Sequence, residues 1–128
     1  MYDRTYYATH PVMMEQASNA ALRERYLVQD LFRPGEVALA YTHADRLVVG
    51  GVAPAAASVL LPRQSEPPSA AGQPFLARRE MAIVNVGAAP GTVSVDGESF
   101  ALDRLDCLYV GMGAGEVAFA GAGARFYL

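Results

Sequence analysis

Residues 75–113 decide the fold of this chain and read FLARREMAIVNVGAAPGTVSVDGESFALDRLDCLYVGMG. Three apolar runs in this stretch are separated by residues that favour tight turns. Val93 and Val95 alternate with polar neighbours, which is the period of a half-buried strand. Asp96 and Gly97 follow, and this pair favours a two-residue hairpin turn because both central positions need positive φ. Short strands with turn signals between them predict an antiparallel sandwich or barrel.

The sequence on both sides of this stretch extends the pattern of short strands. Strands are predicted over residues 27–32, 37–41, 47–52, 58–61, 117–120 and 124–128. One short helix is predicted because Ser18 or Asn19 can cap it, while Leu22 and Tyr26 stand one turn apart. Residues 62–74 are predicted to form a loop, since their prolines keep them out of a sheet interior.

Length and composition indicate one domain over residues 1–128. The formal net charge of −3 gives no basic face, which argues against a nucleic-acid partner. No apolar run approaches the roughly twenty residues that cross a bilayer, and no signal peptide is visible, so a cytoplasmic protein without a membrane partner is expected. The single cysteine, Cys107, is predicted to be a buried, inert thiol. The chain stops inside an apolar run, which we expect of a piece cut from a longer protein.

Two parts of the central stretch resemble the motifs of cupins, small double-sheet barrels that often hold a metal. Glu80 and Gly87 match the glutamate and glycine of the first motif, and residues 106–113 resemble the strand and turn of the second. Residues 73–76 stand where the family has its first two histidines, and the last histidine falls near Glu116. We therefore predict an all-β fold, a cupin-type jelly-roll barrel with one short N-terminal helix and no metal ligand. Glu80 and Glu116 are a carboxylate pair of the kind that binds hard cations, but without the histidines a transition-metal site made of two carboxylates alone would be weak.

Further likeness to a known family extends over nearly the whole chain. The segments that carry it are residues 6–11, 31–36, 41–51, 75–85, 105–111 and 124–128. Together they resemble the N-terminal half of the 5-keto-4-deoxyuronate isomerases, two-cupin enzymes of pectin and uronate breakdown. The resemblance implies a ketol isomerisation of a small sugar acid, 4-deoxy-5-keto-hexuronate, and a homo-oligomer, which is a hexamer in the family. It also implies a zinc ion, held by three histidines and a glutamate, in a second cupin that this chain lacks. No cofactor is therefore expected in this chain, and we expect it to be inactive alone.

Five polar residues are candidates for contact with such a substrate: His43, Asp45, Arg46, Arg78 and Arg79. His43 is either a proton carrier or sugar contact, because imidazole titrates near neutral pH, or a structural residue hydrogen-bonded to the backbone or to Asp45. An arginine fork matches a uronate carboxylate, whereas the alternative for Arg78 and Arg79 is an internal ion pair or a subunit contact. On a strand, Arg78 and Arg79 would point to opposite faces. No catalytic base is identified.

Three functions remain open on these observations. The first is half of a ketol-isomerase, whose reaction through an enediol needs a base and an electrophile. The family's electrophile is the metal of the second half. The second is a non-catalytic module whose strands and 62–74 loop bury surface against sister domains. The third is a relative of 5-deoxyglucuronate isomerase, which shares the two-cupin layout.

Overall fold

Short strands make up most of the regular structure in the computed structural model, which describes all 128 residues. The strands are β1 (Arg4–Tyr6), β2 (Val37–Thr42), β3 (Leu47–Val52), β4 (Val59–Leu60), β5 (Met81–Asn85), β6 (Gly91–Val95), β7 (Glu98–Leu102), β8 (Cys107–Val110), β9 (Val117–Ala120) and β10 (Phe126–Tyr127). One α-helix is present, α1 (Asn19–Tyr26), and short 3-10 helices cover Pro11–Met14 and Pro68–Ala70. Neither kind of helix is long and apolar enough to cross a membrane.

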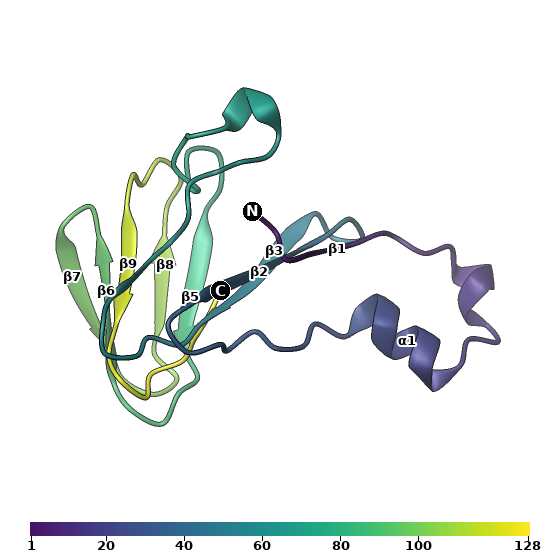
Figure 1. The fold of residues 1–128 in the computed structure, drawn as a ribbon, viewed down its shortest axis with the longest axis horizontal. Coiled ribbons are helices and arrows are strands. Elements are labelled where there is room, and N and C mark those ends of the chain that lie inside the picture. Colours follow the sequence, from purple (N-terminus) through teal and green to yellow (C-terminus); the bar gives the residue numbers. More distant parts are fainter.

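The strands form two sheets, which Figure 1 shows from one side. The six-stranded sheet has the order β1-β2-β3-β10-β5-β8, and the four-stranded sheet has the order β4-β9-β6-β7. Strand pairs are antiparallel except for β1 with β2. This arrangement confirms the predicted all-β fold with one short N-terminal helix, and it is consistent with a cupin-like jelly roll.

The core lies between the two sheets because alternate residues of a strand point to opposite faces. In β5, Met81 and Ile83 are buried, whereas Ala82 between them is exposed. Phe119 of the smaller sheet packs against Phe126 of the larger one, with ring centroids 5.5 Å apart. Burying one large apolar side chain contributes about 1.5–3 kcal/mol. Apolar contacts of this kind therefore hold the sheets face to face.

The hairpin between β6 and β7 has the turn that the sequence predicts. Asp96 and Gly97 both have positive φ, at 49° and 89°. The Asp96 carboxylate accepts hydrogen bonds from the backbone N–H groups of Gly115 and Glu116, at 3.1 and 2.8 Å. These donors hold the pKa of Asp96 below its usual value, because they favour the charged form. The turn is thereby tied to the loop before β9.

The predicted strand over residues 27–32 is wrong, because this segment forms no strand. Asp30 has φ 59°, which interrupts an extended backbone. The sheet edge beside β2 is occupied by β1, where Thr5 pairs with Tyr41, so residues 27–32 find no free edge there. The other predicted strands are present, with small shifts at their ends.

Residues 7–30, here called the arm, leave the sheets and return to them (Figure 1). Ser18 caps α1 as predicted, since its hydroxyl accepts the Ala21 N–H at 3.2 Å. No residue of α1 is buried. The base of the arm is fixed where the Tyr6 hydroxyl donates to the Leu27 carbonyl at 2.9 Å. The rest of the arm projects from the two sheets.

Cys107 is exposed, so the prediction of a buried thiol is wrong. It lies on β8, an edge strand, where Val110 is buried and Tyr109 is exposed. Alternation along the strand puts Cys107 on the same outer face as Tyr109. The apolar neighbours of Cys107 in the sequence could not show which face the thiol would take.

Candidate functional site

Four separate parts of the chain meet around a cavity of about 370 Å³, here called the tyrosine cavity. They are the N-terminal residues around β1, the end of β2, the 62–74 loop and the residues before β5. The lining residues are Tyr2, Thr5, Tyr7, Tyr41, His43, Glu66, Pro67 and Arg79. His43 and Arg79, two of the five candidates from the sequence, therefore line one cavity.

The parallel pairing of β1 with β2 explains why these residues share a face. Thr5 lies beside Tyr41 in the register of the two strands. Alternation turns the neighbouring Tyr6 to the opposite side, where it is buried, and leaves Tyr7 exposed. His43 follows Tyr41 by two residues and lines the cavity with it. The pairing continues past β2, because the His43 N–H donates to the Tyr6 carbonyl at 2.8 Å.

Four rings form one continuous aromatic wall of the cavity. Tyr7 stacks on the His43 imidazole with centroids 5.0 Å apart and planes 10° from parallel. Tyr41 meets His43 edge to face at 4.9 Å, and Tyr2 lies 5.5 Å from Tyr41. The stacked and the edge-to-face arrangements are both favourable for aromatic pairs. These ring contacts hold the imidazole in place. The sequence had left open a hydrogen bond from the His43 side chain to Asp45 or to the backbone, and the structure shows neither.

Arg79 brings positive charge to the cavity. Its guanidinium is half-buried, lies 4.9 Å from the centroid of the Phe75 ring and donates to the side-chain oxygen of Gln64 at 3.3 Å. Arg79 takes part in none of the ion pairs of the structure, so the internal ion pair considered from the sequence is not found. Burial raises the pKa of the Tyr2 hydroxyl, although the charge of Arg79 opposes this rise. Arg79 is thus a partly dehydrated cation without a carboxylate partner.

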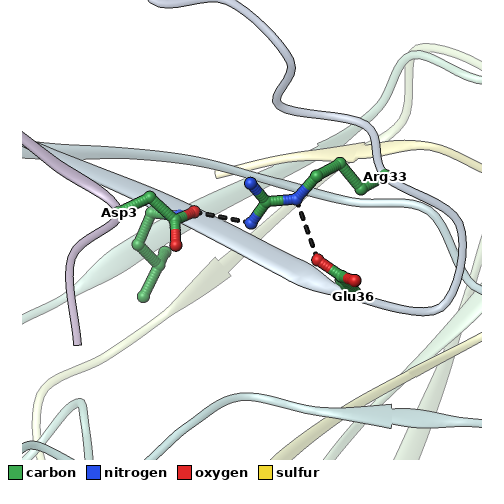
Figure 2. A network of polar contacts seen from close by, with 4 residues as sticks. Asp3, Arg33 and Glu36 are labelled. Carbon is green, nitrogen blue, oxygen red and sulfur yellow. Dashed lines mark hydrogen bonds and ion pairs between the residues drawn. The ribbon is translucent and has the colours of Figure 1, made fainter.

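Arg33, in contrast to Arg79, lies between two carboxylates. Figure 2 shows its guanidinium between Asp3, at 2.7 Å, and Glu36, at 2.9 Å. The hydrogen bond to Asp3 raises the pKa of Arg33. Asp3 also accepts the backbone N–H of Leu39 at 3.3 Å. This network fastens the start of the chain to β2 and so keeps Tyr2 near the cavity.

Gln64 orders the 62–74 loop, and the sequence carried no sign of this role. Its side-chain nitrogen donates to the Pro74 carbonyl at 2.8 Å. Its backbone carbonyl accepts the Gly72 N–H at 2.8 Å. The residue is 6% exposed, although a glutamine in a proline-rich segment suggests a solvated position. By closing the loop on itself, Gln64 keeps Glu66 and Pro67 at the rim of the cavity.

The remaining candidate residues lie elsewhere. Arg46 lines a second, more apolar cavity of about 450 Å³ against β3, β5 and β10, which Arg79 also reaches. Asp45 and Arg78 are exposed and line neither cavity. The structure thus brings His43 together with Arg79, and Arg46 together with Arg79, but it does not gather all five.

The expectation that Arg78 and Arg79 lie on a strand is wrong. Residues 75–78 form a turn, and β5 begins only at Met81. Phe75 and Leu76 are both buried, at 4% and 1% exposure, and two adjacent buried side chains do not fit the alternation of a strand with one solvated face. The turn anchors itself in the core through this pair and places Arg79 beside the cavity.

The side chains of this chain do not fit a zinc ion held by three histidines and a glutamate. Glu80, at the cupin glutamate position, accepts the Tyr109 hydroxyl at 2.6 Å, which raises the pKa of Tyr109. The Nδ1 of His10 accepts the Val12 N–H at 3.3 Å in the arm, far along the chain from the ring stack of His43. No three side chains of His, Cys, Asp or Glu gather into a group that could hold a metal.

No known protein-family profile matches the chain. Curated proteins similar to it include the 4-deoxy-L-threo-5-hexosulose-uronate ketol-isomerases of three bacteria. The protein of Cereibacter sphaeroides is 51% identical over 122 residues, that of Kineococcus radiotolerans 46% over 129, and that of Bacillus pumilus 43% over 125. Each match covers 95% of this chain but only 43%, 45% and 44% of the respective relative. The chain therefore spans less than half the length of the curated relatives it matches.

Proposed function

Because this chain is homologous over nearly its whole length to one part of the 4-deoxy-L-threo-5-hexosulose-uronate ketol-isomerases, we propose that it is the N-terminal cupin-like half of such an enzyme. The 51% identity over 95% of the chain is the observation that supports this proposal. The enzyme would interconvert 4-deoxy-5-keto-hexuronate and 3-deoxy-2,5-diketo-hexonate in pectin breakdown. A cytoplasmic location agrees with the exposed, unpaired thiol of Cys107, which suits a reducing compartment.

Ketol isomerisation moves a proton between neighbouring carbons and needs both a base and an electrophile that holds the developing negative charge. The chain offers no gathered set of metal-binding side chains for the electrophile. We place the zinc implied by the resemblance in the part of the relatives that this chain does not span. The 128-residue chain by itself is therefore expected to be inactive.

A chimera tests this proposal directly. This chain replaces the matching part of the Cereibacter sphaeroides relative, and isomerisation of 4-deoxy-5-keto-hexuronate is measured for the chimera, the intact relative and the 128-residue chain. We expect turnover by the chimera and the intact relative and none by the chain alone. Enzymes exceed uncatalysed rates by a factor of about 10⁶ or more, so the outcomes separate clearly. Activity of the isolated chain, or a folded chimera that turns over only 5-deoxyglucuronate, would overturn it.

Assembly is a second function, and the arm is the observation that favours it. Met13 and Tyr26 are 60% and 54% exposed, and no residue of α1 is buried. A free helix of eight residues is unstable in water unless its side chains pack against something. The arm points away from its own sheets (Figure 1), so they cannot cover its outer end. With the homo-oligomer implied by the resemblance, we infer that the arm packs against a second copy of the chain.

Serine at the exposed apolar positions of the arm is expected to weaken this assembly. Met13→Ser with Tyr26→Ser removes two large contacts, and the dissociation constant should rise by about a hundredfold or more. Light scattering across a concentration series measures the oligomeric state. The matched control is Leu60→Ser with Met112→Ser, at sites 55% and 69% exposed outside the arm, and it should leave assembly unchanged. A parent chain that stays monomeric at high concentration contradicts the inference. In that case the arm would not pack against a second copy of the chain.

A further inference from the structure

We propose that the tyrosine cavity binds a small ring-shaped carboxylate of the sugar-acid class. The choice of a sugar acid rests on the proposed function, whereas the site itself belongs to this chain and binding there needs no turnover. Three features carry the inference: an arginine without a carboxylate partner, a wall of aromatic rings, and a rim of hydroxyl groups around one open cavity.

Arg79 is the residue that would bind the carboxylate of the ligand. Its guanidinium uses one nitrogen for Gln64 and stacks on Phe75, which leaves its other donors for an incoming carboxylate. Arginine binds carboxylates through two parallel hydrogen bonds, and partial burial strengthens them. Glu66 also lines the cavity, but it pairs with the N-terminal ammonium of Met1 at 3.4 Å. A second negative charge is thus balanced before the ligand arrives.

The net charge of the site favours a carboxylate over a phosphate. Arg79 is the only arginine among the lining residues, and the chain contains no lysine. One guanidinium neutralises one negative charge, which matches a monoanion. A phosphate monoester carries about two charges at neutral pH and is usually bound by several donors.

The aromatic wall is the reason for proposing a ring-shaped ligand. The stacked pair of Tyr7 and His43, with Tyr41 and Tyr2 beside it, offers flat apolar faces for the C–H face of a sugar ring. The hydroxyls of the tyrosines and of Thr5 supply polar groups for the sugar hydroxyls. A volume of about 370 Å³ lies in the range of small-ligand cavities. An aliphatic dicarboxylate would leave this wall unused.

Binding of D-glucuronate to the 128-residue chain tests the site, with D-glucose as the analogue that lacks the carboxylate. Calorimetry gives the affinity, and proton NMR follows the two imidazoles of the chain. We expect glucuronate to bind at least about tenfold more tightly than glucose, as a charge-assisted hydrogen bond predicts. The His43 signals should shift on titration, whereas those of His10, in the arm, should stay in place. Inorganic phosphate should compete more weakly than glucuronate.

Variants locate the ligand. Arg79→Gln should weaken glucuronate binding about tenfold or more and leave glucose binding unchanged, with Arg79→Lys between the two. The matched control is Arg78→Gln, one residue away, exposed and outside the cavity, which should bind as the parent does. Should loss of the Phe75 contact unfold Arg79→Gln, Tyr7→Ala on the exposed rim gives the second test and should weaken both sugars.

Three results with the two sugars and the variants would overturn the proposal. They are equal affinity for glucuronate and glucose, shifts at His10 as large as those at His43, and equal losses for Arg78→Gln and Arg79→Gln. Tighter binding of phosphate than of glucuronate would also reject a carboxylate site. Because the chain is tested without its proposed catalytic half, none of these outcomes depends on the chimera experiment.

Discussion

Asn85→Ala is expected to lower the free energy of unfolding by about 3–4 kcal/mol, a large share of the 5–15 kcal/mol typical of a domain. Asn85 is fully buried, and its amide is saturated. Its nitrogen donates to the carbonyls of Ala89 and Leu102, at 2.9 and 3.0 Å. Its oxygen accepts the N–H groups of Gly87 and Arg125, at 3.0 and 3.3 Å. Alanine would leave these four backbone groups without their hydrogen-bond partner. Denaturant unfolding measures the resulting loss in the free energy of unfolding.

Two variants separate the network from side-chain loss in general. Asn19→Ala makes the same chemical change at the chain's other asparagine, which is exposed in the arm, and should stay within about 0.5 kcal/mol of the parent. Asn85→Asp keeps the shape but turns a carboxylate toward two carbonyls. Burial and these acceptors raise the pKa of that carboxyl, so its protonated form, which can donate, persists above the usual aspartate pKa and is lost only as the pH rises through the raised value. The deficit relative to the parent should therefore grow as the pH rises. A loss at Asn19 equal to that at Asn85 would show that the network is not the cause.

Gly87→Ala is the second large effect, with an expected loss of about 1–3 kcal/mol or more. A Cβ at Gly87 would press on the backbone nitrogen of Arg125 and lie 2.7 Å from the Gly123 carbonyl oxygen. Both are backbone atoms and cannot swing aside as a side chain can. The approach is fixed by the Val86 N–H, which donates to the Arg125 carbonyl at 2.7 Å. This crowding is the physical reason for a glycine at position 87.

Gly111→Ala is the matched control for this change. A Cβ there meets nothing within 4 Å, and the residue does not have positive φ. It should be neutral or slightly stabilising, because alanine restricts the unfolded chain. Thermal unfolding of both variants measures the difference, and equal stability of Gly87→Ala and the parent would contradict the crowding. Since Gly87 also donates to Asn85, the two large losses should not add in the double variant.

The tyrosine cavity shows which features of the candidate site the sequence could predict and which it could not. His43 and Arg79 were both expected to contact a substrate, because their chemistry suits a sugar acid. Arg78 was an equally good candidate, since nothing local distinguishes it from Arg79. Burial of Phe75 and Leu76 makes a turn where a strand was expected, and that turn decides which arginine meets the cavity. The role of Gln64 was missed because the partners of its side chain, Pro74 and Arg79, lie 10 and 15 residues away along the chain.

The sequence by itself determined most of the strands and the hairpin, because apolar alternation and the φ preference of Asp96-Gly97 act between neighbours in the chain. It also carried the likeness to the ketol-isomerases. Only the tertiary structure decided that β1 joins β2 in parallel, that residues 27–32 form no strand, and that Cys107 faces outward. It also decided the surroundings of Asn85, whose partner Arg125 is 40 residues away. These outcomes depend on which distant segments pack together, and no local pattern records that choice.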